Sequence, residues 1–503
     1  MEPQTRAETT SYKETSLHKH VMEFLAALEA RADPRLHIYS FGASPGGREF
    51  PLVVLSQHGI RTPEESRKRG LPVVLVINGI HAGEVEGKEA SLMLMRDLLD
   101  GKHGDLLAEL TLVVVPLFNP DGNDAIDPAN RRLDLKKLEG QDGPDRVGTR
   151  VNATGINLNR DYMRQGAPEM RLLQAKVVQV WQPDLTIDTH ATNGSVHRMA
   201  MTYDVPHTVA SGRPEPIAFM RNKMMPAVQA ALAKDHKLLA GWYGNFIEDE
   251  RTMEAQRDAE PAAPVTEGWM TYTHHPRFGS NYRGLSNRLD LLLECYSYLS
   301  FPDRVTTTYA TLLEALRYVA THRDDVMQIV AASRTPRDKI AIRYKLDAFD
   351  GTIDIPTMTP RTPTGAPSIA KVRYFGSFTG TTVVDRPPAY LVEPNVAAHL
   401  ARHGLKVEHA EGSIDVEVAT ISGFGSEGGR KILESASVGD LHVTWKRAKR
   451  PGHGLHLVRT DQPLGAIAVY LCEPESDDGV VENGLVEQPT IGNEFPVARA
   501  FLK

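Results

Sequence analysis

The chain has 503 residues, of which 41% are hydrophobic and 24% charged, with a net charge of −7 and a pI near 6.3. A chain of this length exceeds one ordinary hydrophobic core, so we expect two domains. The mild acidity gives no electrostatic reason to expect nucleic acid as a partner, and no run approaches the roughly eighteen apolar residues of a membrane span.

The two cysteines, Cys295 and Cys472, are too few for a disulfide framework or a cysteine zinc site. Any metal would therefore be bound by histidines and carboxylates. The first twenty residues lack the apolar core of a signal peptide. We expect either a cytoplasmic protein, or a secreted or periplasmic one whose signal peptide has been removed; no feature specifies an oligomeric state.

Helical and extended patterns alternate through the first two thirds of the chain. Residues 16–30 predict an amphipathic helix with Ser16 as its N-cap and one apolar face, formed by Val21, Phe24, Leu25 and Leu28. The next two extended runs, LHIYSFG and FPLVVLS, flank a Gly-rich turn and predict a hairpin.

Four near-continuous apolar runs then predict strands buried on both faces: 71–78, 111–120, 183–191 and 288–297. A helix pattern at 85–100 separates the first two, and a long helical stretch covers 303–333. This alternation is typical of βαβ units in an α/β fold.

Pro/Thr-rich runs between 335 and 368 interrupt the periodicity and place a domain boundary near 338. We therefore expect a catalytic domain at 1–337 and a smaller, mostly β accessory domain at 338–503. One helix is expected there, at 394–404. The other apolar runs read as strands: KVRYFG, AYLVEP, IDVEVATI, LHVTWKR and AIAVYLCEP.

His81 and Glu84 lie in the motif HAGE, directly after the strand at 71–78 and a Gly turn. An imidazole and a carboxylate on one tight loop can reach the same ion, and this donor pair suits Zn²⁺. The spacing alone is weak evidence, since His20 and Glu23 repeat it inside the terminal helix, where a solvated helix face explains them.

His190 and Glu294 strengthen the case. His190 ends an apolar run, and ligands of open α/β sheets bind beyond the carboxyl ends of the strands, so His81 and His190 are expected in one crevice. The simpler alternative is a hydrogen-bonded histidine at a strand end. Glu294 lies inside an apolar strand, where a carboxylate is costly unless it is paired, metal-linked or functional. A buried salt bridge is the alternative for Glu294.

Several motifs together resemble the zinc carboxypeptidases of the carboxypeptidase A type, with some features of the cytosolic carboxypeptidase branch. The resemblance spans roughly residues 35–300, about half the chain, and the motifs occur in the family's order: HAGE (81–84), NPDG (119–122), GINLNRDY (155–162), DTH (188–190) and ECY (294–296).

The resemblance implies a mixed, mostly parallel central sheet with helices on both faces. It also implies one zinc ion held by His81, Glu84 and His190, with water in the fourth place, and Glu294 as general base. The substrate would be a peptide with a free C-terminal carboxylate, bound by the pair that matches the family's Asn-Arg, Asn159 and Arg160.

The oxyanion-stabilising arginine and the substrate tyrosine are less directly specified. Arg150 has the spacing to the Asn-Arg pair found in cytosolic-type relatives, and Arg132 is the second choice. Arginines on a surface loop are the alternative for both. Tyr282, in a Gly-rich and Arg-flanked setting, is preferred over Tyr272 as the tyrosine near the substrate, although either ring could simply pack at a domain edge.

The chain departs from the family pattern at Asn157, where many relatives carry an Asp that hydrogen-bonds a zinc-ligand histidine. Asn157 can still accept a bond through its carbonyl, and Asp188 offers a carboxylate two residues before His190. This departure leaves the ligands intact but puts the strength of the metal site in question.

Two further functions remain open at this point. A zinc amidohydrolase acting on N-acyl amino acids or cell-wall peptides would share the zinc chemistry, although such deacylases are usually shorter and lack NPDG. A catalytically inactive peptide-binding homologue is disfavoured because all four core residues are present. Arginines near the expected side-chain pocket favour acidic C-terminal residues: Arg277, Arg283 and Arg288.

Overall fold

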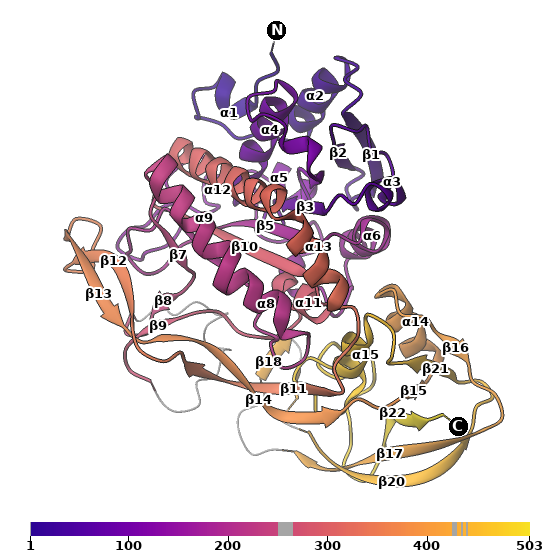
Figure 1. Cartoon of the computed structure of the whole chain (residues 1–503). Coiled ribbons are helices and arrows are strands. Elements are labelled where there is room, and N and C mark those ends of the chain that lie inside the picture. Colours follow the sequence, from indigo (N-terminus) through magenta and orange to yellow (C-terminus); the bar gives the residue numbers. More distant parts are fainter. Residues whose placement is uncertain (1, 250–264, 425–429, 434–435, 439–440, 503) are drawn as a thin grey trace.

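The computed structural model describes residues 2–249, 265–424, 430–433, 436–438 and 441–502 (Figure 1). Its main sheet has eight strands: β1 (Leu36–Ala43), β2 (Glu49–Leu55), β3 (Val73–Asn78), β4 (Thr111–Val115), β5 (Leu185–Thr192), β6 (Met201–Asp204), β7 (Ala240–Trp242) and β10 (Leu289–Tyr296). The strand order is β1-β2-β4-β3-β5-β10-β6-β7. The four central strands β4, β3, β5 and β10 are parallel, as the resemblance implies for a mixed sheet.

Helices cover both faces of this sheet (Figure 1). The longer ones are α2 (His18–Glu29), α4 (Glu86–Leu99), α12 (Phe301–Thr321) and α13 (Arg323–Ala332). The shorter ones are α1 (Arg6–Thr9), α3 (Pro63–Lys68), η1 (Leu106–Ala108), α5 (Pro120–Asp124), η2 (Leu158–Arg160) and α11 (Gly279–Leu285). Two composite helices contain π-helical turns: α6 (Pro168–Leu172), η3 (Leu173–Val178) and α7 (Gln179–Trp181) form one, and α8 (Pro214–Phe219), η4 (Met220–Met224), α9 (Met225–Ala231) and η5 (Leu232–His236) the other.

The alternation of side chains along β3 explains why its sequence is continuously apolar. Val74 and Val76 join a core with α2, α4 and α12, whereas Leu75 and Ile77 join the core on the opposite face, which contains the helix at 168–181. A strand buried on both faces needs apolar residues at successive positions. The polar residues at its end therefore stand out as candidates for function.

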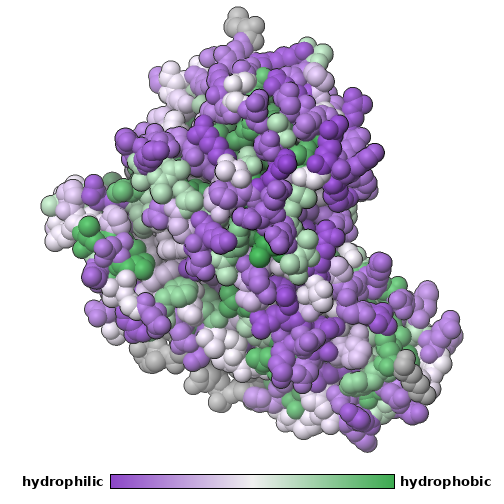
Figure 2. Space-filling view, in the orientation of Figure 1, coloured by the Kyte–Doolittle hydropathy of each residue, from purple (hydrophilic) through white to green (hydrophobic). Residues whose placement is uncertain are grey.

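In its described residues the C-terminal region is mostly β, with two helices, α14 (Pro394–Arg402) and α15 (Gly465–Cys472). Its six-stranded sheet has the order β16-β21-β15-β22-β17-β20 and consists of β15 (Ala389–Val392), β16 (Glu408–His409), β17 (Ser413–Phe424), β20 (Leu441–Pro451), β21 (His456–Arg459) and β22 (Glu494–Phe501). Two hairpins are separate from it: β12 (Ile353–Thr359) with β13 (Ala366–Val372), and β18 (Arg430–Leu433) with β19 (Ala436–Val438). In Figure 2 apolar side chains gather on the projecting β12–β13 hairpin, which carries the exposed Ile369.

A further sheet crosses the predicted domain boundary. It joins β8 (Asn245–Phe246) and β9 (Trp269–Met270) to β11 (Lys339–Ala348) and β14 (Tyr374–Asp385), in the order β11-β14-β9-β8. The division at 338 remains a prediction, because β11 begins at Lys339 but its sheet includes β8 and β9 from the other side of that boundary. Within the described residues, no helix is both long and apolar enough to span a membrane.

Two local predictions are wrong. Ser16 is not the N-cap of α2, which is Leu17; the Ser16 hydroxyl instead donates to Glu89 Oε2 at 2.9 Å. The run AIAVYLCEP is not a strand, because most of it forms α15, whose eight residues are all buried. A segment buried on every side has no polar face, so its hydrophobic pattern does not distinguish a helix from a strand. The apolar face predicted for α2 is confirmed, since all four of its residues are buried.

Candidate metal centre and substrate pocket

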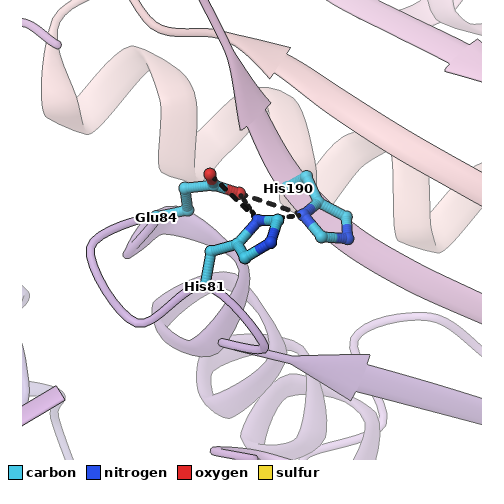
Figure 3. A group of neighbouring side chains, drawn as sticks. All are labelled: His81, Glu84 and His190. Carbon is cyan, nitrogen blue, oxygen red and sulfur yellow. Dashed lines mark hydrogen bonds and ion pairs between the residues drawn. The ribbon is translucent and has the colours of Figure 1, made fainter. Parts of the chain in front are cut away.

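His81, Glu84 and His190 converge at the carboxyl ends of β3 and β5 (Figure 3). The two Nδ1 atoms of the histidines lie 3.1 Å apart. Glu84 Oε2 lies 3.3 Å from His81 Nδ1 and 3.0 Å from His190 Nδ1. All three side chains are almost fully buried. Two imidazole nitrogens and one carboxylate oxygen therefore face a common point.

These donors fit a zinc ion. Tetrahedral zinc with bonds of about 2.0–2.2 Å holds its ligand atoms roughly 3.3 Å apart, close to the separations seen here. Neutral imidazole and carboxylate are also the donor types that zinc accepts in catalytic sites. The ligand set implied by the resemblance is thus brought together in a geometry that can hold one ion.

Glycines allow the loop after β3 to bring His81 and Glu84 to this point. A Cβ atom at Gly83 would lie 2.7 Å from the carbonyl oxygen of Gly148 and 2.8 Å from Cδ of Arg131. A Cβ atom at Gly87 would lie 2.1 Å from Thr189 Oγ1, so α4 packs directly against β5. Larger residues at these glycines would push the loop away from His190 on β5.

The outer nitrogens of both histidines meet polar partners. His81 Nε2 lies 3.1 Å from Asn157 Oδ1, so the amide that departs from the family pattern still offers an acceptor. His190 Nε2 lies 3.3 Å from Asp188 Oδ1. Such partners fix the ring orientation and increase the basicity of the nitrogen that binds the metal. Here the charged partner belongs to His190 and the neutral one to His81.

The pKa values of His81 and His190 are shifted in opposite directions. Burial and, to a lesser degree, the Arg150 cation lower the pKa of His81 to about 3. Burial also acts to lower the pKa of His190, but Asp188 and Glu84 outweigh it and raise this pKa to about 10. Burial disfavours a charged Glu84, yet His81, Arg131 and His190 hold its pKa well below the usual range. Without a metal, the site therefore holds a proton on His190 against a carboxylate.

Glu294 lies on β10 directly opposite His190 on β5 in the parallel register. Its partly buried side chain lines the same cavity of about 290 Å³ as His81 and Glu84. Burial and then the repulsion of Glu84 raise the pKa of Glu294 to about 8, although the His190 cation opposes this shift. Its neighbour Cys295 is buried in the core on the opposite face of the strand. A carboxyl group with this pKa is suited to exchange protons near neutral pH.

Two arginines reach the metal-ligand cluster. Arg150 Nη1 lies 3.2 Å from both Glu84 Oε1 and His81 Nδ1, and its side chain is 43% exposed. Arg131 Nη1 donates to the same Glu84 oxygen at 3.1 Å. Spacing did not single out Arg131, although the motif NRRLD contains it. Arg132, the second choice, is not among the residues that line this cavity in the described part of the chain.

Asn159 and Arg160 also line the cavity. Asn159 Oδ1 accepts a hydrogen bond from the backbone N–H of Gly279 at 2.9 Å. The guanidinium carbon of Arg160 lies 3.7 Å from the centroid of the Phe278 ring. The Asn-Arg pair is thus held against the loop that leads into α11.

The structure does not bring Tyr282 to this cavity. Its hydroxyl lies 2.7 Å from His403 Nδ1, and it lines a separate cavity of about 860 Å³ beside α14. Because Tyr282 lies within α11, the helix turns its ring away from the metal-ligand cluster. Tyr272, the second choice, does line the 290 Å³ cavity, as does Tyr243, which the sequence analysis missed.

The arginines expected near the side-chain pocket are engaged elsewhere. Arg283 pairs with Asp188 and Asp290, whereas the closest carboxylates to Arg277 and Arg288 belong to Asp478 and Asp184. None of the three lines the 290 Å³ cavity within the described residues. The prediction that these three arginines line the side-chain pocket and favour acidic C-terminal residues is therefore wrong. The cavity instead has an apolar wall, formed by Tyr243, Tyr272, Phe278 and Leu292.

Residues 21–195, which contain the three metal-ligand candidates, match the family model of the zinc carboxypeptidases. Over these residues the chain is similar to the zinc carboxypeptidase family. Its curated relatives include carboxypeptidase 2 of Trichophyton rubrum, 23% identical over 91% of this chain and 81% of the relative. Carboxypeptidase 2 of Trichophyton equinum is 22% identical with the same coverage. The matched family model and the names of these relatives support a metallocarboxypeptidase, and zinc is the metal of the matched family.

Solved structures of similar proteins include a metallo-carboxypeptidase from Burkholderia cenocepacia, with a TM-score of 0.41 and 17% identity over 60% of this chain and 69% of that one. The carboxypeptidase A of Helicoverpa armigera gives a TM-score of 0.39 and 13% identity over 64% of this chain and 75% of that one. At these TM-scores the likeness to solved structures adds nothing to the sequence matches.

Proposed function

We propose that this enzyme hydrolyses the C-terminal peptide bond of peptides, with His81, Glu84 and His190 as zinc ligands and Glu294 as general base. The observation that supports this most directly is the position of Glu294. It lies opposite His190 in the register of β5 and β10 and shares one cavity with His81 and Glu84. A strand-borne acid beside an ion site is the arrangement that water-mediated hydrolysis needs.

A zinc ion bound there would supply Lewis-acid chemistry, lowering the pKa of water and polarising the scissile carbonyl. Glu294 takes a proton from the attacking water and delivers it to the leaving amine. The raised pKa of Glu294, about 8 without a metal, favours delivery of the proton to the leaving amine. The positive charge of a bound ion would favour the carboxylate form that accepts the proton from water. The water oxygen forms the new bond to the carbonyl carbon as the C–N bond breaks.

Arg131, Arg150 and Arg160 have different roles in this proposal. Arg131 is only 17% exposed and fixes one oxygen of Glu84. Arg150, the more exposed of the two, faces the cavity and stabilises the negative charge that develops on the carbonyl oxygen. Asn159 and Arg160 bind the chain-end carboxylate, each charge-assisted bond contributing roughly 1.5–3 kcal/mol. Tyr243 and Tyr272 take the place of Tyr282 as the tyrosines that contact substrate.

Matched peptides with free and amidated C-termini test this function. We expect release of the C-terminal residue from the free peptides and at least a hundredfold lower kcat/KM, about 2.7 kcal/mol, for the amidated ones, because the amide forms no ion pair with Arg160. N-acyl amino acids extend the panel. Preferred cleavage of the N-acyl group would instead support an amidohydrolase, and no cleavage of any substrate would support a binding protein.

The apolar wall predicts which C-terminal residue is preferred. Burying an aromatic side chain against Tyr243, Tyr272 and Leu292 is favourable, whereas a charged side chain would lose its hydration there. We expect kcat/KM for C-terminal Phe to exceed that for Glu or Lys by at least about tenfold. A series of peptides that differ only in the last residue measures this ratio. A preference for C-terminal Glu would contradict it.

A further inference from the structure

The C-terminal region contacts the loop that borders the candidate substrate site. This loop, residues 274–278, leads from β9 into α11 and carries Phe278 at its end. Residues 473–483, which follow α15, lie opposite this loop and are here called the support segment. Helices α11 and α15 are in contact and lie close together in Figure 1.

Two adjacent aspartates of the support segment bind the loop at separate points. Asp477 Oδ2 lies 2.7 Å from His274 Nε2, in a contact between almost completely buried side chains. Asp478 Oδ2 accepts a hydrogen bond from the backbone N–H of Arg277 at 2.6 Å. Asp478 is fully buried, so this bond is shielded from water.

The aspartates are themselves fixed. Tyr470 on α15 donates to Asp477 Oδ1 at 2.6 Å. Asn483 donates to Asp478 Oδ1 at 3.3 Å and to its carbonyl oxygen at 3.0 Å. His274, His275 and Asp477 are close enough to be considered as a second metal site. Both oxygens of Asp477 are already engaged, by His274 and Tyr470, and we therefore interpret the group as a tether between the two regions.

The far side of the loop meets the residues proposed to bind substrate. The carbonyl oxygen of Arg277 accepts from the backbone N–H of Tyr162 at 3.4 Å, two residues after Arg160. Phe278 stacks under the Arg160 guanidinium, and the N–H of Gly279 donates to Asn159. Arg277 thus bonds to the support segment through its N–H and, through its carbonyl, to Tyr162 in the segment that carries the Asn-Arg pair.

We propose that Asp477 and Asp478 are positioning residues, which hold the loop at 274–278 so that Phe278 and Gly279 orient Arg160 and Asn159 toward the substrate's carboxylate. This inference rests on the proposed function. It gives the C-terminal region a role in substrate binding, although none of its residues lines the 290 Å³ cavity among those described. Loosening the tether weakens recognition of the chain end while the zinc ligands and Glu294 keep their places.

The test compares Asp478→Ala with the wild-type full-length protein, on a free peptide that the wild type cleaves. We expect KM to rise at least about tenfold, kcat to stay within about threefold, and zinc content to be unchanged. Amide hydrogen exchange within residues 274–279 is expected to accelerate, because the Arg277 N–H loses its acceptor. Asp477→Asn, a milder variant in case the first does not fold, is expected to raise KM about threefold.

Glu482→Gln is the matched control. Glu482 Oε2 accepts from the N–H of Gly479 within the support segment, and burial raises the pKa of Glu482 to about 8, so the neutral amide replaces a neutral acid at pH 7. Its kinetics and exchange are expected to match the wild type. Variants with unchanged KM overturn the proposal, whether or not exchange accelerates, and so does a loss confined to kcat. A wild type that cleaves no free peptide refutes the proposed function, and this inference with it.

Discussion

Glu294→Gln is expected to lower kcat by about 10²–10⁴-fold while the protein keeps its zinc. Glutamine has the same shape but cannot take a proton from water or return one to the leaving amine. The backbone contact of this residue, in which Thr202 Oγ1 donates to its carbonyl at 2.9 Å, does not depend on the side chain. The loss is therefore expected in turnover, with little change in folding.

Single-turnover kinetics and metal analysis check this prediction together. Glu169→Gln is a suitable control, because Glu169 is also a buried carboxyl, accepts from Asn152 at 3.0 Å, and lies outside the catalytic cavity. The control is expected to retain wild-type activity and zinc. Wild-type turnover in Glu294→Gln would remove Glu294 from the mechanism.

The second large effect is expected for Glu84→Gln. One oxygen of Glu84 accepts from Arg131 and Arg150, and the other faces both histidines. The NH₂ group of glutamine would face either the two arginines or the two histidines. The substitution also removes the negative charge that offsets the positive charge of the arginines and of a bound ion. We expect zinc affinity to fall on the order of 100-fold or more and activity to fall with it. Competition with a chelating dye measures the affinity; an unchanged value would contradict the assigned ligand.

Zinc binding is also expected to depend on pH. In the metal-free protein the pKa of His190 is raised to about 10, so His190 carries a proton across the neutral range, and zinc must displace it. If one proton is released, the apparent affinity increases about tenfold for each pH unit between 6 and 8. Titrations at three pH values measure this slope. A flat profile would show that the ligand is already deprotonated, contrary to the contacts with Asp188 and Glu84.

The convergence of His81, Glu84 and His190 was predictable from the sequence for a physical reason. His81 and His190 end apolar strands, and parallel strands present their carboxyl ends at one edge of the sheet. Once the ends of the parallel strands are identified in the sequence, residues that follow them can be predicted to lie close together. Tyr282 and α15 were mispredicted because their placement depends on tertiary contacts, with His403 in one case and burial on all sides in the other.

The position of Arg131 beside Glu84 could not be predicted from the spacing of motifs in the sequence. It reaches Glu84 because Gly83 leaves room for its side chain and because its own backbone adopts a φ of 49°, in the left-handed region. Neither condition follows from the motif NRRLD. The aromatic wall of the cavity could not be predicted either, because it depends on tertiary contacts that hold Arg277, Arg283 and Arg288 out of the lining.

The sheet shared by β8, β9, β11 and β14 has a consequence for how the enzyme can be divided. A fragment that stops at residue 337 would leave the edge of β9 without its neighbour β14 and would strip the cover from one continuous apolar core, which includes Trp181 on one side and Leu400 and Ile467 on the other. Exposed strand edges and bare apolar surface promote aggregation. Residues 1–337 are therefore not expected to fold as an independent domain. Fusion proteins and truncated variants need residues 338–503 as well.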